Sequence, residues 1–299
     1  MNKKLNTLLF IFVSLALSVT AQEKQGELEK QLQEAIANKN AQIGVAVIID
    51  GKDTITLNNN ACYPMMSVVK FHQALAVAHY LEQRKLPLTT SIPIKKSALH
   101  PDTYSPLRDK YPQGNIHISI QDLLIYTLQK SDNNACDILF DYAGGVTQTD
   151  NYIRSLGLSN FSITATEVDM HRDWQVCYQN RTSPLDAARL LDMLITRPLF
   201  GNIYQTFIKR TMIECQTGKD RLSKPLLGTK AVIGHKTGTG PRNAKNQLIG
   251  TNDIGFVLLP DGRRYTIAVF VKDSEENALT TSQIIADISG VVYQYICSH

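Results

Sequence analysis

The sequence predicts an α+β fold with two lobes, and three observations lead to this prediction. Strand-type patterns occur near both ends of the chain, and helical patterns fill the long segment between them. The 299 residues, with 43% hydrophobic content, can bury a substantial core. Because an isolated two-stranded hairpin is not stable, the N-terminal strands should join the C-terminal ones. We therefore expect one antiparallel sheet flanked by N- and C-terminal helices, plus an all-helical lobe.

The predicted sheet lobe comprises about residues 22–61 and 217–299. Its N-terminal part has a helical pattern followed by two β-rich runs that flank the turn Asp50–Asp53, and its C-terminal part has three β-rich runs and a last helix. In chain order these elements are expected at residues 23–40, 41–50, 54–57, 231–238, 253–259, 263–271 and 280–296.

The middle of the chain, about residues 62–216, has mostly helical periodicity. Helices are expected over residues 71–83, 119–129 and 183–195. Ser119 and Asp122 form a capping pair at the start of the second of these. With no repeat or linker between the segments, residues 22–299 are expected to form a single catalytic domain with a cleft between its lobes.

The N-terminus has the features of an export signal. Lys3 and Lys4 precede an apolar run of about 12 residues, and small residues follow up to Ala21. A membrane span needs ~20 residues, so residues 1–21 are expected to be a signal peptide that is cleaved near Ala21. The mature chain should then be periplasmic or secreted, without membrane attachment.

Charge and cysteine usage exclude several functions. The 31 basic and 27 acidic residues are spread along the chain, so no patch for nucleic acid or an acidic membrane is predicted. The five cysteines have no C-x-x-C spacing, which argues against a zinc site. We expect most of them to be small buried hydrophobic residues. The cysteines are Cys62, Cys136, Cys177, Cys215 and Cys297.

Three short motifs carry the chemistry. Ser67 lies three residues before Lys70, so a helix would place both on one face. The other two motifs are Ser131-Asp132-Asn133 and Lys236-Thr237-Gly238, at 64 and a further 105 residues along the chain. Each motif alone is weak, since a polar helix start or a strand that ends at glycine would look the same. Together, and in this order, chance explains them poorly.

The three motifs resemble those of the serine β-lactamase and penicillin-binding protein superfamily, which has a β-lactamase/transpeptidase-like fold. Further matches resemble class A β-lactamases, especially the divergent branch of extended-spectrum cephalosporinases. Glu167 lies where that class has the acid of its omega loop. Tyr104 corresponds to an aromatic residue at the cleft entrance, and Arg221 to a basic residue that holds the substrate carboxylate.

The resemblance implies β-lactam hydrolysis through a serine acyl-enzyme, with small-molecule substrates and resistance to antibiotics as the result. No metal, organic cofactor or nucleic acid is implied, and a monomer is expected. The implied catalytic residues are Ser67, Lys70, Ser131 and Glu167. The implied substrate-binding residues are Tyr104, Asn133, His171, Arg221, Lys236, Thr237, Gly238 and Thr239.

A serine needs a base to become a good nucleophile. Burial and the charge of Lys236 would let Lys70 lose its proton far below its ordinary pKa, and Glu167 acting through water is the competing base. The oxyanion would face the backbone N–H groups of Ser67 and, by resemblance, Thr239. Which base acts in acylation stays open at this point.

The loop after Glu167 departs from the class A pattern Glu-Pro-x-Leu-Asn. Without the proline, a cis bond costs ~3 kcal/mol, so a trans bond and a differently folded loop are expected. His171 replaces the asparagine and should help to hold the hydrolytic water. Ala165 and Asn180 replace the usual ion pair, and Asp137 is expected to tie the loop to the helical lobe. These changes predict a preference for cephalosporins.

Two alternatives share the three motifs. A D-alanyl-D-alanine carboxypeptidase and a penicillin-recognising sensor domain both acylate their serine, but neither has a carboxylate that activates the deacylating water. Glu167 therefore favours a hydrolase that turns over.

Overall fold

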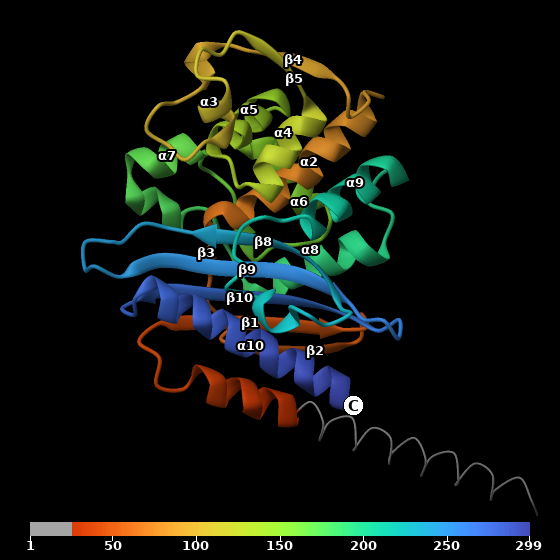
Figure 1. Ribbon diagram of the computed structural model, residues 1–299, viewed down its shortest axis with the longest axis vertical. Helices are drawn as coiled ribbons and strands as arrows, with labels where there is room; N and C mark the ends of the chain where they lie inside the picture. Colours follow the sequence, from red (N-terminus) through yellow and green to blue (C-terminus); the bar gives the residue numbers. More distant parts are fainter. Residues whose placement is uncertain (1–25) are drawn as a thin grey trace, which may run out of the picture.

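The computed structural model describes residues 26–299, so the predicted signal peptide lies outside the described residues. The molecule is layered around one sheet (Figure 1). In this view a mostly helical lobe lies above the sheet, the last helix passes in front of the lower strands, and the helix over residues 26–36 lies beneath them. None of the helices in this part of the chain is long and apolar enough to cross a membrane.

The sheet has the strand order β2-β1-β10-β9-β8, with every neighbouring pair antiparallel. The first hairpin therefore joins the C-terminal strands, as its length predicts. The strands are β1 Gln42–Ile49, β2 Asp53–Leu57, β8 Val232–Thr239, β9 Leu248–Leu258 and β10 Arg264–Ser274. β8 is an edge strand that faces the helical lobe.

Each face of the sheet packs into its own hydrophobic core. Because neighbouring side chains of a strand alternate between faces, Val45 and Ala46 of β1 enter different cores. Val45 packs with the lower helices, which include α10 (Ala278–Ser298). Ala46 and Phe270 of β10 pack with the helices of the upper lobe. Because both faces of the sheet are buried, packing fixes the position of the sheet relative to the helices around it.

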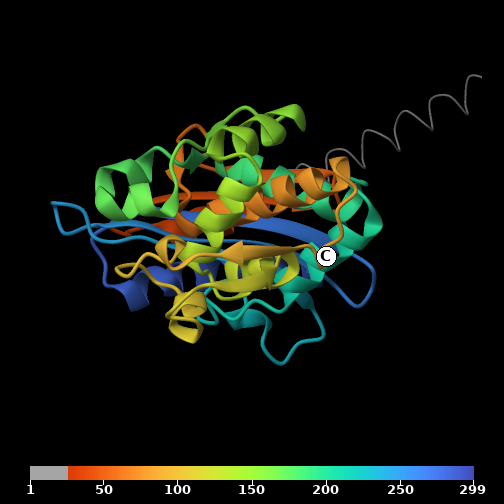
Figure 2. The same ribbon diagram turned by 90° about the horizontal axis from the view of Figure 1, so that it is seen from above.

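The upper lobe is built around α2 (Val69–Gln83), which follows the short 3-10 turn η1 (Met66–Val68) and is buried along most of its length. Figure 2 shows the lobe from above. Its other helices are α3 Pro106–Lys110, α4 Ile120–Gln129, α5 Asn133–Tyr142, α6 Val146–Ser155, α7 Glu167–Arg172, α8 Pro184–Thr196 and α9 Asn202–Ile213. The Ser119 side chain caps α4 by accepting from the Asp122 N–H, as predicted.

The middle segment differs from an all-helical lobe in two respects. It contains short strands, and α8 packs against the sheet strands β1, β9 and β10 rather than only against helices. The strands are β3 Tyr63–Pro64, β4 Ser91–Ile94, β5 Ile116–Ser119, β6 Phe161–Ser162 and β7 Arg181–Thr182. Strands of two to four residues are too short to produce a periodic pattern, so the sequence did not reveal them.

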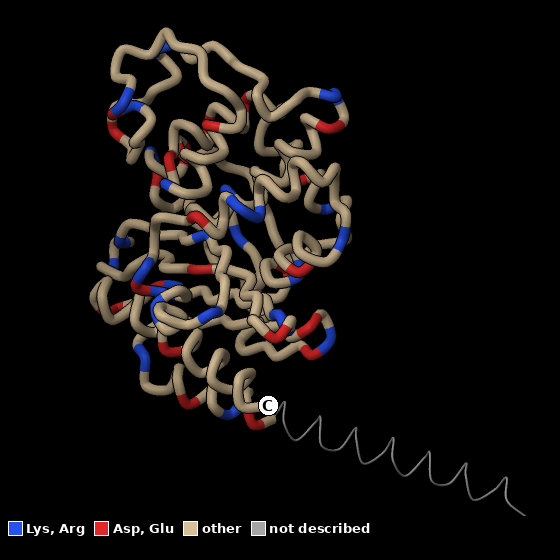
Figure 3. The backbone as a smooth tube through the Cα atoms, turned by 45° about the vertical axis from the view of Figure 1, so that its right-hand side comes forward, with Lys and Arg blue, Asp and Glu red and all other residues tan. Residues whose placement is uncertain are grey.

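Charged residues of both signs are interspersed along the backbone (Figure 3).

Candidate active site

The three motifs meet in a cavity of about 290 Å³ between the helical lobe and the edge strand β8. Polar side chains from both lobes form its walls. They are Ser67, Tyr104, Ser131, Asn133, Thr217, Asp220, Arg221, Thr237 and Thr239, together with Gly218. The cavity thus contains residues from all three sequence motifs.

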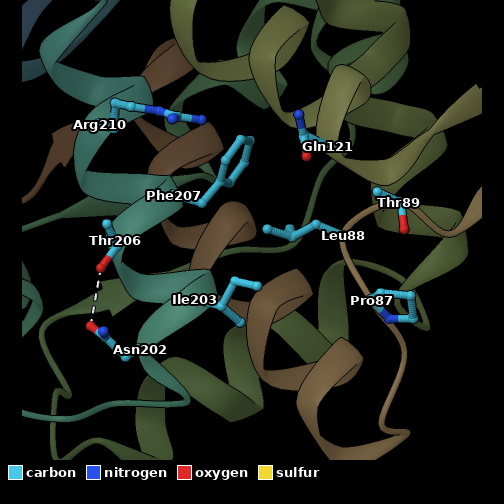
Figure 4. A pocket seen from close by; sticks show the side chains of 9 residues that line it. All are labelled: Pro87, Leu88, Thr89, Gln121, Asn202, Ile203, Thr206, Phe207 and Arg210. Carbon is cyan, nitrogen blue, oxygen red and sulfur yellow. Dashed lines mark hydrogen bonds between the residues drawn. The ribbon is translucent and has the colours of Figure 1, made fainter.

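A larger hollow of about 640 Å³ lies elsewhere, against α9 (Figure 4). Leu88, Ile203 and Phe207 give it a mainly apolar lining, and Arg210 is its charged residue. It has no nucleophile with an adjacent base, so it is not the catalytic site despite its size.

Ser67 lies on η1, and Lys70 lies in the first turn of α2. Lys70 Nζ is 2.9 Å from Ser67 Oγ, so the predicted spacing does bring the two groups into hydrogen-bond contact. Met66 and Ser131 both have positive φ, at 50° and 58°. This conformation is costly for residues other than glycine. Here it occurs at the residue before Ser67 and at Ser131 itself.

Lys70 is fully buried and is held by oxygens on several sides. Nζ donates to Ser67 Oγ, to the Ser131 carbonyl at 3.1 Å and to Asn133 Oδ1 at 2.6 Å. It also lies 2.8 Å from Glu167 Oε1. An ammonium has three protons to donate, and Ser67 Oγ, the Ser131 carbonyl and Asn133 Oδ1 accept these three hydrogen bonds. Glu167 Oε1 therefore has an ionic contact with Lys70 but no hydrogen bond of good geometry within the described protein.

The charge of Lys70 corrects the expectation from sequence. Burial is the largest single influence and acts to lower the pKa of Lys70, as expected, but Glu167 first, and then Cys136 and Asp132, together raise this pKa above its ordinary value. Lys70 is thus an ammonium in the resting site. The expectation that it loses its proton far below its ordinary pKa was wrong because the sequence did not show that Glu167 lies in direct contact.

The Ser131-Asp132-Asn133 motif forms the turn that begins α5. Asp132 is fully buried and caps the helix by accepting from the Ala135 N–H, and it also accepts from the Leu107 N–H. It is thus a structural carboxylate. Its neighbours face the cavity, where Ser131 Oγ accepts from Lys236 Nζ at 3.0 Å.

Lys236 is fully buried on β8. Its ammonium donates to Ser131 Oγ and to the Thr237 carbonyl at 2.8 Å. Burial, and then repulsion from Lys70, lower the pKa of Lys236 to about 7. Of the two lysines, Lys236 is therefore the one whose charge is weakened.

The rest of the edge strand forms a polar wall. Arg221 donates to Thr239 Oγ1 at 2.7 Å and to the Gly238 carbonyl at 3.0 Å, which orients its guanidinium beside the cavity. Gly238 is required for packing, because a Cβ there would lie 2.5 Å from the Met65 carbonyl oxygen. The Gly240 N–H pairs with β9. Since alternate residues of an antiparallel strand pair, the Thr239 N–H points to the unpaired edge.

The loop around Glu167 is held by hydrogen bonds in place of an ion pair. Both oxygens of Asp137 accept from the loop, from the N–H groups of Glu167 at 2.8 Å and Val168 at 2.9 Å. Asn180 is fully buried and bonds to both the N–H and the carbonyl of Ala165. The described peptide bonds are trans. Asp137 therefore ties the loop to α5, as expected.

Three of the predicted site residues are exposed: Tyr104, His171 and Thr239 at the end of β8. Tyr104 is 59% exposed and lines the cavity at its rim. His171 lies in the last turn of α7, is exposed, and makes no hydrogen bond to the described residues. The structure therefore gives His171 no contact that would hold a water beside Glu167, and this role stays a prediction.

Several residues of the site were missed by sequence reasoning. Thr217 Oγ1 is 2.7 Å from Thr237 Oγ1, and Thr103 Oγ1 accepts from Asn133 Nδ2 at 2.7 Å. Both threonines lie in loops without a motif, so no sequence signal could have found them.

The burial of the cysteines also differs from expectation, because only Cys136 and Cys177 of the five are buried.

Comparisons with known proteins agree with this geometry. The model of the family described as "Beta-lactamase enzyme family" matches residues 27–296. A beta-lactamase of Bacteroides uniformis is 40% identical over 96% of both chains. The extended-spectrum beta-lactamase PER-1 of Pseudomonas aeruginosa is 37% identical, over 90% of this chain and 87% of that one. A class A beta-lactamase structure from Bacteroides cellulosilyticus superposes with a TM-score of 0.88, at 41% identity, covering 92% of this chain and 99% of that one.

Proposed function

Since the chain belongs to the beta-lactamase enzyme family, as a class A serine β-lactamase, we propose that Ser67 is the nucleophile that opens the β-lactam ring. The 2.9 Å contact between Lys70 Nζ and Ser67 Oγ, with Glu167 on the far side of the same ammonium, supports this role most directly. It joins a nucleophile to a proton acceptor through one intervening group.

Proton transfer during acylation has a definite direction in this arrangement. Lys70 is an ammonium in the resting site, so Glu167 has to take up a proton when Ser67 loses its own. Lys70 can first pass a proton to Glu167 and then take that of Ser67, or a water can connect Ser67 to Glu167. In both routes Glu167 holds the proton only until the departing ring nitrogen takes one up, so acylation ends with an acylated Ser67, a protonated nitrogen and Glu167 again as a carboxylate.

The edge-strand wall suits a substrate that carries a carboxylate. Lys236, Arg221 and the hydroxyl of Thr239 present positive charge and hydrogen-bond donors on one side of the cavity. Ser131, which accepts from Lys236, is placed to pass a proton to the departing ring nitrogen. The N–H groups of Ser67 and Thr239 would stabilise the oxyanion, where one donor is worth roughly 3 kcal/mol in other hydrolases.

Deacylation is the step that separates a hydrolase from its acylated relatives. Glu167 is nearly buried beside Lys70 and is held by the Asp137 contacts to the loop backbone. A carboxylate at this position can activate water against the Ser67 ester. The rebuilt loop and the similarity to an extended-spectrum enzyme support a preference for cephalosporins, and hence a role in antibiotic resistance.

We further infer that the mature chain acts outside the cytoplasm, in the periplasm or after secretion, as a monomeric single domain. The basic and apolar pattern of residues 1–21 supports export. Substrates would be small β-lactams, with Tyr104 at the cleft rim and Asn133 contacting the amide side chain.

Turnover of a chromogenic cephalosporin by the purified mature chain tests the proposal. We expect multiple turnovers, which Ser67→Ala and Glu167→Ala should each reduce at least 1,000-fold. Intact-mass measurement should find the covalent adduct in Glu167→Ala but not in Ser67→Ala. Ser159→Ala and Glu34→Gln, at exposed positions, are the matched controls and should retain activity.

A single stoichiometric burst in the unmodified protein would contradict the proposal. That result would favour a D-alanyl-D-alanine carboxypeptidase or a penicillin-recognising sensor. Release of D-alanine from a peptide ending in D-alanyl-D-alanine would then separate these two.

A further inference from the structure

A cysteine, a histidine and an aspartate lie next to one another behind the wall of the cleft. His235 Nδ1 is 3.0 Å from both carboxylate oxygens of Asp253, and the Cys215 thiol lies beside the same ring. Asp253 and His235 are buried, whereas Cys215, just after the end of α9, is partly exposed. Cys215 is therefore the member of this cluster that is partly exposed.

The groups that face Cys215 favour its anionic form. Burial acts to raise the pKa of the thiol, but His235, Lys236 and a hydrogen bond from Thr217 outweigh burial and lower this pKa to about 7. Burial acts to lower the pKa of His235, but Asp253 and then Cys215 raise it to about 10. The carboxylate of the adjacent Glu214 accepts from Gln129 Nε2 at 2.8 Å, so its hydrogen bond is to α4 and not to Cys215. A cationic imidazole thus faces the sulfur.

The cluster is connected to the substrate cavity through two threonines. Cys215 Sγ is 3.4 Å from Thr217 Oγ1, which is 2.7 Å from Thr237 Oγ1. The segment 215–217 therefore runs beside residues 235–237 of β8, with Cys215 facing His235 and Thr217 facing Thr237. Thr217 and Thr237 both line the cavity. A group attached to Cys215 would disturb the wall that holds the substrate carboxylate.

We propose that Cys215, with His235 and Asp253, is a thiol modification site whose reaction with a low-molecular-mass disulfide weakens β-lactam binding. The sulfur of Cys215 forms a bond to one sulfur of the disulfide, the disulfide bond breaks, and the second sulfur leaves as a thiolate. The disulfide is itself the oxidant, and exchange with an excess of small thiol reverses the reaction.

The remaining cysteines provide internal comparisons. Cys136 and Cys177 are buried, whereas Cys62 and Cys297 are exposed. Neither exposed cysteine has a histidine and aspartate arranged as at Cys215 among the described contacts. Exposure alone would therefore make Cys62 and Cys297 react first, and activation by His235 would favour Cys215.

The test measures thiol chemistry and turnover separately. In the full mature chain, alkylation by iodoacetamide is followed at each cysteine by peptide mass spectrometry from pH 5 to 10. The midpoint for Cys215 should lie about one to two pH units below those of Cys62 and Cys297. In the Cys62→Ser/Cys297→Ser background, oxidised glutathione should form one mixed disulfide, on Cys215. KM for a cephalosporin should then rise roughly fivefold, as for one lost hydrogen bond, and dithiothreitol should restore it.

Two variants serve as controls. Cys215→Ser in the same background should keep its KM after glutathione treatment, and His235→Asn should move the alkylation midpoint of Cys215 up towards the others. A midpoint at or above that of Cys62, absence of the mixed disulfide, or a mixed disulfide that leaves KM unchanged would each overturn the proposal. If His235→Asn does not fold, the comparison among cysteines of the unsubstituted chain decides. The effect on KM rests on the proposed function, but the midpoint and the adduct mass do not, so the two failures are distinguishable.

Discussion

Lys70 and Lys236 are both fully buried in one site, yet their charges are set in opposite directions. Burial disfavours the ammonium of each lysine. At Lys70 the carboxylate of Glu167, 2.8 Å away, reverses that effect. Lys236 has no carboxylate in contact among its described partners, and the charge of Lys70 weakens its own charge further. The ion pair thus keeps Lys70 an ammonium in the resting site, whereas Lys236 is close to losing its proton near neutral pH.

The pH dependence of catalysis follows from Lys236. With a pKa of about 7 in the free enzyme, Lys236 loses its proton as the pH rises through that value, and a neutral amine attracts an anionic substrate less. We expect kcat/KM for a cephalosporin to fall by up to tenfold per pH unit above about 7. A bound carboxylate raises this pKa, so the alkaline limb of kcat should lie at higher pH.

Steady-state kinetics from pH 5.5 to 9.5 checks this prediction. Lys236→Arg keeps a charge that does not titrate in this range, and its alkaline limb in kcat/KM should move upwards. An unchanged limb in that variant would assign the titration to another group.

At the scale of elements, α7 and its flanking loop depend on two polar side chains from other segments. Asn180 bonds to the N–H groups of Thr164 and Ala165 and to the Ala165 carbonyl, and Asp137 bonds to the start of α7. The Thr166 side chain also caps α7 in a capping box with Asp169. These contacts satisfy the backbone of a loop that lacks the family's ion pair.

Loss of Asn180 should loosen this loop. Asn180→Ala leaves three backbone groups unpaired, two of them buried, so the free energy of unfolding should fall by roughly 2–4 kcal/mol, and deacylation should slow. Urea denaturation and the lifetime of the acyl-enzyme measure the two effects. Gln179→Ala, at the exposed neighbouring position, should change stability by under about 0.5 kcal/mol. Equal effects of both substitutions would contradict the role given to Asn180.

Asp137 should affect the same loop in a pH-dependent way. Asp137→Asn turns an NH2 group towards one of the two backbone donors and should cost about 1–2 kcal/mol at pH 8. Burial, and then Glu167, raise the pKa of Asp137 to about 7. Below that pH the native carboxyl gains a proton and one of its oxygens becomes a donor, so the difference between the two proteins should shrink. Thermal denaturation at pH 5.5 and pH 8 measures this, with Asp141→Asn as the exposed control. A constant difference would count against it.

For the whole molecule, the two lobes share one core. Ile254, Phe256 and Phe270 of the sheet belong to the same hydrophobic cluster as the helices α2, α4 and α8. A lobe that lost the other would therefore expose a large apolar surface. The two lobes are therefore parts of one fold and not independent units, because α8 of the helical lobe packs on the sheet.

The shared core predicts cooperative unfolding. Near-ultraviolet signals from Trp174, which lies in the loop after α7, and far-ultraviolet signals from all helices should change at the same urea concentration. Phe270→Ala should shift both transitions together and lower the free energy of unfolding by about 3–5 kcal/mol. Two separate transitions would contradict the prediction of a single domain.

The order of the five main-sheet strands, the longer helices α2, α4, α8 and α10, the Ser119 cap and the residues of the three motifs could be predicted from the sequence. These features depend on local periodicity and on neighbours a few positions apart. Three other features became known only from the tertiary structure: which of the two lysines is a stable cation, the exposure of His171, and the position of Cys215 beside His235. Each of these depends on contacts between residues far apart in the chain. Electrostatic effects act over a few ångströms in space, and the sequence does not contain those distances.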